Sequence, residues 1–203
     1  MAAFERTVRH IHDLFPTGTL ALQFLEPYDL RNSFLFQLEN GPESVEMMEI
    51  EHDSPKFSTD NVKFALEELS IDMVAISGEI EPEYICSAPL RSRKVYLETA
   101  HWLNLNAILN METEELEISD EEDLLSMREI RLIIEKWLSG GLENLKSIVT
   151  EVDEEAKGNA DLQRRRIQKI MDGVGELRRS DGKTAILYFD DGIRFVVMEA
   201  EIN

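Results

Sequence analysis

SMREIRLIIEKWLSGGLENLKSIVTEV, residues 126–152, combines one helix and one strand whose limits can be predicted from side-chain chemistry. Ser126 is placed to accept a hydrogen bond from a first-turn amide, while Glu129 can accept one from the backbone of Ser126, which is the capping-box arrangement. Apolar residues then recur at helical spacing and form one stripe: Met127, Ile130, Ile134 and Trp137. Leu138 widens this stripe near its end. The pattern predicts a helix that begins after Ser126 and buries one face.

The end of this helix is marked by Gly140 and Gly141, which follow the last apolar turn. A glycine in that place can adopt the left-handed conformation that ends many helices. The apolar run Ile148–Val152 then predicts a buried strand.

The same succession of a short strand and a helix recurs along the chain. The first apolar residues of the strand-like segments lie about 21 to 32 residues apart: Leu20, Met48, Val74, Val95, Leu116 and Ile148. Five of them have an apolar residue two positions on: Leu22, Ile50, Ile76, Leu97 and Ile118. Such periods are typical of leucine-rich-repeat-like stacking, in which neighbouring modules share one core. We expect an irregular α/β solenoid with a curved, mainly parallel sheet and helices on the outer side. Because the spacings vary, an ordinary layered α/β domain is the alternative.

The two ends of the chain differ from this pattern. Residues 1–16 predict an N-terminal capping helix closed by proline. Residues 153–203 predict a helix over 160–177, followed by apolar runs beside the turn signals at 180–183 and 190–192. We expect this C-terminal part to form a β-hairpin or meander that covers the edge of the sheet.

Composition limits the class of protein. The 203 residues suit a single domain spanning 1–203, and 43% of them are hydrophobic. The net charge of −20 disfavours nucleic acid and anionic membranes as partners and favours basic proteins, although such a charge also serves solubility alone. No apolar run approaches the roughly 20 residues that span a bilayer, and no signal-peptide core is present. Cys86 is the only cysteine, which favours a reducing compartment, cytoplasmic or nuclear.

No motif in the sequence predicts catalysis. His10 and His12 are two apart on a helix, so they cannot share a metal as an i, i+4 pair would. The acidic run Asp120–Asp123 lacks the alternation and glycine of a calcium loop and is interpreted as a solvated loop. We therefore expect no enzyme activity, no cofactor and no metal site. A hydrolase built from scattered Asp, Glu and His is the weaker alternative.

Several segments together resemble the F-box-associated domain of nematode F-box proteins, in its second type. The strongest likeness lies in WLNLNAILNM (102–111), ELEIS (115–119) and RLIIEKWLSGGLENL (131–145). RRSDGKTAI (178–186) resembles the terminal segment of the family, and IHDLFP (11–16) more loosely its start.

This resemblance implies a substrate-recognition domain of a ubiquitin-ligase adaptor, in which an F-box binds a Skp-type subunit of a cullin ligase. Because the domain pattern begins within the first fifteen residues, a Skp-type partner is expected only if an F-box lies outside this chain. The alternative is a free-standing inhibitor or antidote that binds its partner without ubiquitination. The family signature residues Trp102, Trp137 and Gly141 are expected to hold the fold.

A partner surface is expected on the outward positions of the strands, because sheet surfaces are the usual binding side of solenoids. The predicted partner-binding residues are Glu49, Glu51, Ser77, Tyr96, Glu98, Glu117 and Ser119, with Ala75 among them. Half of these eight positions are glutamates, so we expect an acidic face with Tyr96 as an aromatic anchor for a Lys/Arg-rich partner. The alternative is that these residues are only the solvated side of the strands.

Overall fold

The computed structural model describes residues 20–24, 45–68, 71–81, 83–119, 125–151, 174–189 and 192–198, with the backbone alone in residues 20–24, 45–57, 79, 127, 151, 174, 189 and 192. The chain forms strands and short helices in this order: β1 (Leu20–Phe24), β2 (Val45–Phe57), α2 (Thr59–Lys63), a π-helical turn (Phe64–Glu68), β3 (Met73–Ile80), β4 (Lys94–Leu97), α3 (Leu105–Leu109), β5 (Glu115–Ile118), α4 (Met127–Leu138), β6 (Ser147–Glu151), β7 (Val174–Arg178), β8 (Thr184–Phe189) and β9 (Gly192–Met198).

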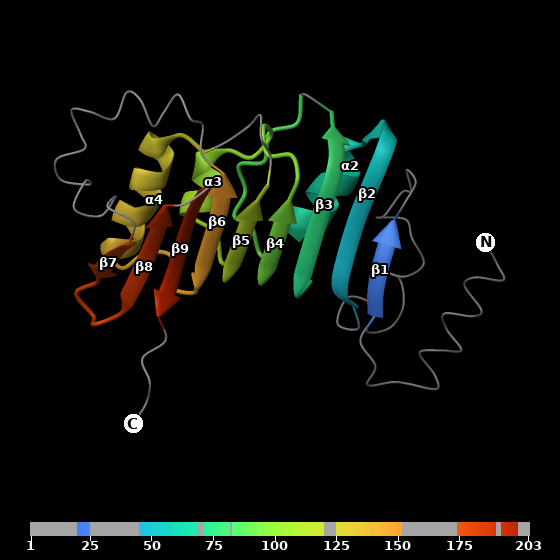
Figure 1. Ribbon diagram of the computed structural model, residues 1–203. Helices are drawn as coiled ribbons and strands as arrows, with labels where there is room; N and C mark the ends of the chain where they lie inside the picture. The colour runs from blue at the N-terminus through green and yellow to red at the C-terminus, as the bar shows by residue number, and fades with distance from the viewer. Residues whose placement is uncertain are drawn as a thin grey trace.

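All the described strands belong to one nine-stranded mixed sheet with the order β1-β2-β3-β4-β5-β6-β9-β8-β7 (Figure 1). Strands β1 to β6 are parallel and stand side by side in sequence order. Strand β9 pairs antiparallel with β6, and β8 and β7 continue the antiparallel part. The fold is therefore α/β with few helices and a sheet that is not closed. The prediction that the six strand segments are neighbours is confirmed, as is a C-terminal meander that covers an edge of the sheet, and the structure shows that this edge is β6.

The register aligns the predicted apolar positions across the strands. One row runs through Leu22, Met48, Val74, Val95, Leu116, Ile148, Phe195 and Leu187. From Val74 onward every side chain in it is buried. The sequence prediction misaligns the first strand, because Leu22 pairs with Met48 whereas Leu20 pairs with Val45. The pairing of β1 with β2 shifts register after Leu20, which a count of residues between strands cannot reveal.

The core lies between the sheet and the helices, which cover one of its faces (Figure 1). Helix α4 has the predicted capping box, with the Ser126 amide donating to Glu129 Oε2 at 2.9 Å and the Glu129 amide donating to Ser126 Oγ at 3.3 Å. Its buried residues are Ile130, Ile133 and Trp137. Ile134, which the predicted stripe contains, is only partly buried. Ile133 and Ile134 both lie about one turn after Ile130, and packing turns Ile133 toward the sheet.

Helix α4 ends as the glycine pair predicts. The Gly140 amide donates to the carbonyl of Trp137 and the Gly141 amide to that of Lys136, each at 3.0 Å, which is the Schellman arrangement. Gly140 has φ +93°, a left-handed conformation that favours glycine.

Some predicted elements differ from the structure. The helix expected over 160–177 is wrong at its end, because residues 174–178 form β7, where Gly175 and Leu177 are buried and Glu176 is exposed. The apolar spacing of residues 102–111 predicts a helix over that whole segment, but α3 is shorter, since Trp102 and Leu103 pair with Cys86. The capping helix expected within 1–16 and the Asp120–Asp123 run lie outside the described residues, as does a helix that the turn signal at 40–42 predicts over 29–38. None of the helices in the described part of the chain has the length and apolar character needed to span a lipid bilayer.

Candidate partner-binding surface

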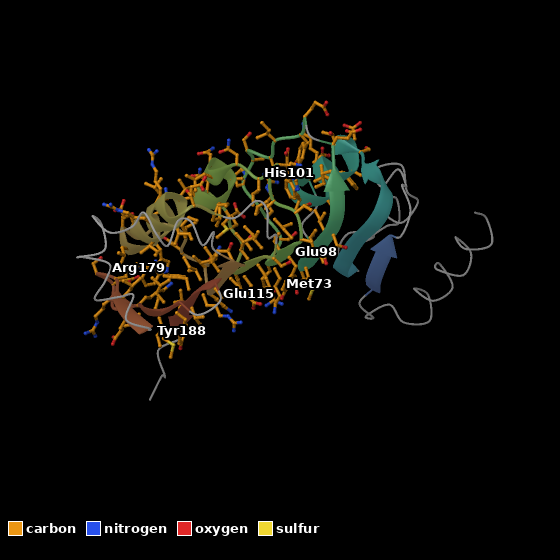
Figure 2. The ribbon with its side chains drawn as sticks, turned by 45° about the horizontal axis from the view of Figure 1, so that its top comes forward. Met73, Glu98, His101, Glu115, Arg179 and Tyr188 are labelled. Atoms are coloured by element: carbon orange, nitrogen blue, oxygen red, sulfur yellow. The ribbon has the colours of Figure 1, made fainter. Side chains whose placement is uncertain are left out.

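The sheet face opposite the helices, called the open face below, is built from alternate residues of seven strands. Each of its residues is at least partly exposed. Met73, Glu115 and Tyr188 lie along the sheet, whereas His101 lies on the helix side (Figure 2). The open face comprises Met73, Ala75, Ser77, Lys94, Tyr96, Glu98, Glu115, Glu117, Ser119, Ser147, Val149, Glu176, Ile186, Tyr188, Arg194, Val196 and Met198.

The structure brings the predicted partner-binding residues into two adjacent rows. Tyr96 stands between Ala75 and Glu117 in register, and Ala75 pairs with Glu49. Ser77 pairs with Glu51 in the next row. That row continues through Glu98 and Ser119, because their amides donate to the carbonyls of Ile76 and Leu97, at 3.0 Å and 2.9 Å. For Glu49 and Glu51 the structure gives the register position only.

Tyr96 and its acidic neighbours combine an aromatic ring with two exposed carboxylates. The ring of Tyr96 is partly buried, while Glu98 and Glu117 are exposed. Neither carboxylate forms an ion pair with another described residue. Two carboxylates thus flank one aromatic ring on two adjacent strands, and both can accept hydrogen bonds from a partner.

The row beside them contains a cation that the sequence prediction did not include. Lys94 Nζ lies 2.9 Å from Glu115 Oε2, its register partner on β5. The Glu115 carboxylate, as the largest influence, raises the pKa of Lys94 above its usual value. Lys94 and Glu115 are far apart in sequence, so this pair could be predicted only by aligning the registers of β4 and β5.

An ion-pair network lies at the start of the parallel strands, one residue before each. Arg93 donates to both carboxylate oxygens of Asp72 at 2.5 and 2.6 Å, and the hydrogen bonds hold the pKa of Asp72 below its usual value. Glu114 Oε2 lies 2.9 Å from Lys146 Nζ and 3.7 Å from Arg93 Nη1. The charges alternate from strand to strand, so the network favours this strand order and register. All four side chains are partly exposed, so solvent and salt weaken each pair.

The antiparallel strands extend the open face with different chemistry. Val149 pairs with Arg194, and Arg194 pairs with Tyr188. Arg194 is exposed and forms no ion pair with another described residue. Tyr188 and Met198 are large hydrophobic side chains that remain 37% and 45% exposed, so they add apolar area to the open face. Arg194, Tyr188 and Met198 are absent from the predicted site, because the attachment of β9 to β6 cannot be read from local sequence.

Among the described residues, nucleophilic and metal-ligating side chains do not gather in one place. Cys86 is buried, and burial raises the pKa of its thiol. His101 is exposed, while the side chains of His10, His12 and His52 lie outside the described part. Across the described ranges no three His, Cys, Asp or Glu side chains are grouped so that they could hold a metal ion.

The indole of Trp137 joins the parallel and antiparallel parts of the fold. It is fully buried on α4 and meets the ring of Phe195 edge to face, with 5.2 Å between centroids. The guanidinium of Arg179, also buried, lies 5.2 Å from the Trp137 ring centroid and donates two hydrogen bonds to Asp181. Trp102, the second tryptophan, is likewise fully buried and packs against Tyr84 at 5.7 Å.

Residues 82–149 match the family model described as F-box associated. The F-box associated range contains β4, α3, β5, α4 and the start of β6, so it supplies the parallel part of the open face around Tyr96 and Glu117. The two tryptophans and the Gly140–Gly141 helix end also lie within it, and they are core and cap residues in the structure. The antiparallel strands β7 to β9 lie beyond the matched range. No curated protein sequence and no solved structure matches the chain.

Proposed function

We propose that this chain is a substrate-recognition domain of an F-box-type adaptor for a cullin-RING ubiquitin ligase, and that it captures a protein partner without catalysing a reaction. The F-box associated match supports a protein-interaction role. The compartment proposed is reducing, cytoplasmic or nuclear, in keeping with one buried free cysteine.

One observation carries the proposal. Glu98 and Glu117 are exposed and not ion-paired to described residues, and both are immediate neighbours of Tyr96. An aromatic ring beside exposed carboxylates suits Lys or Arg, because the ring attracts the cation and the carboxylates pair with it. The excess of acidic over basic residues, 41 against 21, would attract a basic partner before contact. We therefore propose a Lys/Arg-containing protein surface as the substrate feature that is recognised.

The arrangement of the sheet supports a repeat-like use of the open face. Strands β1 to β6 follow each other in sequence order, in parallel and with aligned apolar rows. We propose that this part is an irregular leucine-rich-repeat-like solenoid. Each module then adds one strand to a continuous surface, so neighbouring modules contribute side chains to one binding site.

The test is affinity capture from cells with the natural full-length protein as bait. The bait carries either wild-type sequence, the double change Glu98→Lys and Glu117→Lys, or the matched control Glu112→Lys and Glu143→Lys. The control residues are exposed on the loops after α3 and α4 and give the same change in charge. The expected result is a partner whose binding is lost with the first pair of changes and kept with the control.

Two further readouts decide the ligase role. A Skp-type subunit should co-purify with the bait, and the level of the captured partner should rise when the proteasome is inhibited. Partner capture without either result would instead favour a protein that acts by occupancy alone. Equal capture by the Lys-substituted and control baits would contradict the proposed binding face.

A further inference from the structure

One row of the open face carries opposite charges on its two sides. In order across the sheet it consists of Ala75, Tyr96, Glu117, Val149, Arg194 and Tyr188, called the middle row below. An acid stands on one side of Val149 and a base on the other, with a tyrosine beyond each. The predicted acidic face is thus only one half of the row.

The two charges are separated and available. Glu117 on β5 and Arg194 on β9 stand two strand spacings apart, about 10 Å, with β6 between them. Both side chains are exposed, and neither has an ion-pair partner among the described residues. Glu117 and Arg194 can therefore pair with groups on another molecule, whereas Lys94 is already paired with Glu115.

Several neighbours of Arg194 on the open face are apolar. Val149 and Tyr188 flank it in the middle row, and Val196 and Met198 lie on the same outward side of β9. A segment made only of Lys and Arg would place like charge against Arg194 and leave these apolar side chains uncovered, both of which disfavour binding.

We propose that the open face recognises a bipolar protein segment that crosses the strands. Its basic residue pairs with Glu117 beside Tyr96, its apolar residue covers Val149, and its acidic residue pairs with Arg194. An extended chain advances about 3.3 Å per residue and points alternate side chains to the same side, so the basic, apolar and acidic residues stand two positions apart in turn. The basic and acidic residues are then four positions and about 13 Å apart, from where their long side chains can reach Glu117 and Arg194. This inference rests on the proposed function and replaces a uniformly basic partner with one of defined charge order.

The test uses a phage-displayed library of random peptides, selected on the full chain. The wild-type chain should enrich peptides with Lys or Arg and Asp or Glu about four positions apart, with an apolar residue midway between them. Arg194→Glu should weaken binding of these peptides by at least about tenfold and remove the acidic preference. Glu117→Lys should remove the basic preference. The controls Arg128→Glu on α4 and Glu112→Lys should leave the selected peptides unchanged.

The outcomes separate this inference from the proposed function. Basic peptides whose binding needs Glu117 but is unchanged or strengthened by Arg194→Glu would overturn the bipolar segment and keep the basic partner. Peptides insensitive to both changes, or no enrichment, would overturn both. The middle row has a tyrosine and a charged residue on each side of Val149, so a second copy of the chain in the opposite direction would place Glu117 against Arg194. Self-association is therefore the competing explanation. A dimer in sedimentation that Arg194→Glu dissociates would assign the face to self-association and overturn the proposal.

Discussion

The parallel part of the sheet, β3 to β6, and the antiparallel part, β9 to β7, use their outward side chains differently. On the parallel strands the basic side chains are ion-paired, Lys94 with Glu115 and Arg93 with Asp72. The antiparallel strands instead expose Arg194 and apolar side chains such as Met198. Both parts of the open face have exposed carboxylates, Glu117 in one and Glu176 in the other, but the exposed cation Arg194 and the exposed Met198 belong to the antiparallel part. The F-box associated range contains β4, β5 and the start of β6 and none of the antiparallel strands.

The largest expected effect comes from removing the residue that joins the two parts. Trp137→Ala should lower the free energy of unfolding by about 3–5 kcal/mol, because it leaves a cavity against Phe195 and Arg179. Trp102→Ala, within the parallel part, should cost a similar amount. Urea unfolding measures both losses. Hydrogen exchange should show faster local opening of β8 and β9 in Trp137→Ala only, and equal exchange in the two variants would contradict the joining role.

A smaller loss of unfolding free energy is expected from replacing glycines that have a left-handed backbone conformation, one beside the parallel strands and one in the antiparallel part. Gly140 ends α4 and Gly182 lies in the turn between β7 and β8, and both have φ +93°. Alanine at either position should cost about 1–2 kcal/mol, because an L side chain is strained there. Gly141→Ala should cost less, since its new Cβ would meet the movable end of the Lys136 side chain at 2.6 Å. Thermal or urea unfolding orders the three variants, and a larger loss at Gly141 would show that Lys136 cannot move.

The ion-pair network of the parallel part should contribute a salt-dependent increment. Glu114→Gln should lower the free energy of unfolding by up to about 1 kcal/mol, because it removes the charge facing Lys146 and Arg93. Glu112→Gln, an exposed carboxylate nearby in sequence, serves as the control. The difference between these variants should shrink in about 1 M salt, where charges are screened over a few ångströms. A salt-independent difference would point to a packing effect instead.

The smallest effect is expected in the antiparallel part at low pH. The Arg179 guanidinium lowers the pKa of Asp181 to about 2, from an ordinary value of 3.8. Because the folded-state pKa is the lower one, Asp181 stabilises the fold above about pH 4, and this contribution is lost as pH falls toward 2. The urea midpoints of the wild-type chain and Asp181→Asn should differ at about pH 5 and converge near pH 2. A constant difference across that range would contradict the lowered pKa.

Local signals explain which elements the sequence could predict. The limits of α4 depend on Ser126, Glu129 and Gly140, which act within one turn, and they agree with the structure. The sequence prediction misses β7 because only Gly175 and Leu177 alternate inward, too few to oppose a helical interpretation. It places Trp102 in a helix because the pairing partner of that residue, Cys86, is distant in sequence.

The candidate site likewise contains residues that the sequence could predict and residues that it could not. Tyr96 and Glu117 could be predicted because each strand alternates between inward and outward residues. Arg194 could not, because its place depends on β9 pairing with β6, and both β7 and β8 come between these two strands in the sequence. Local turn signals predict a hairpin but not the strand beside which it lies.

The central claim is that the open face, and not the helix side, meets the partner. A photo-crosslinking amino acid placed at Tyr96, and in a second variant at the 36% exposed Leu132 of α4, tests this directly with the captured partner. We predict a crosslink from position 96 and none from position 132. A crosslink from position 132 alone would contradict the claim.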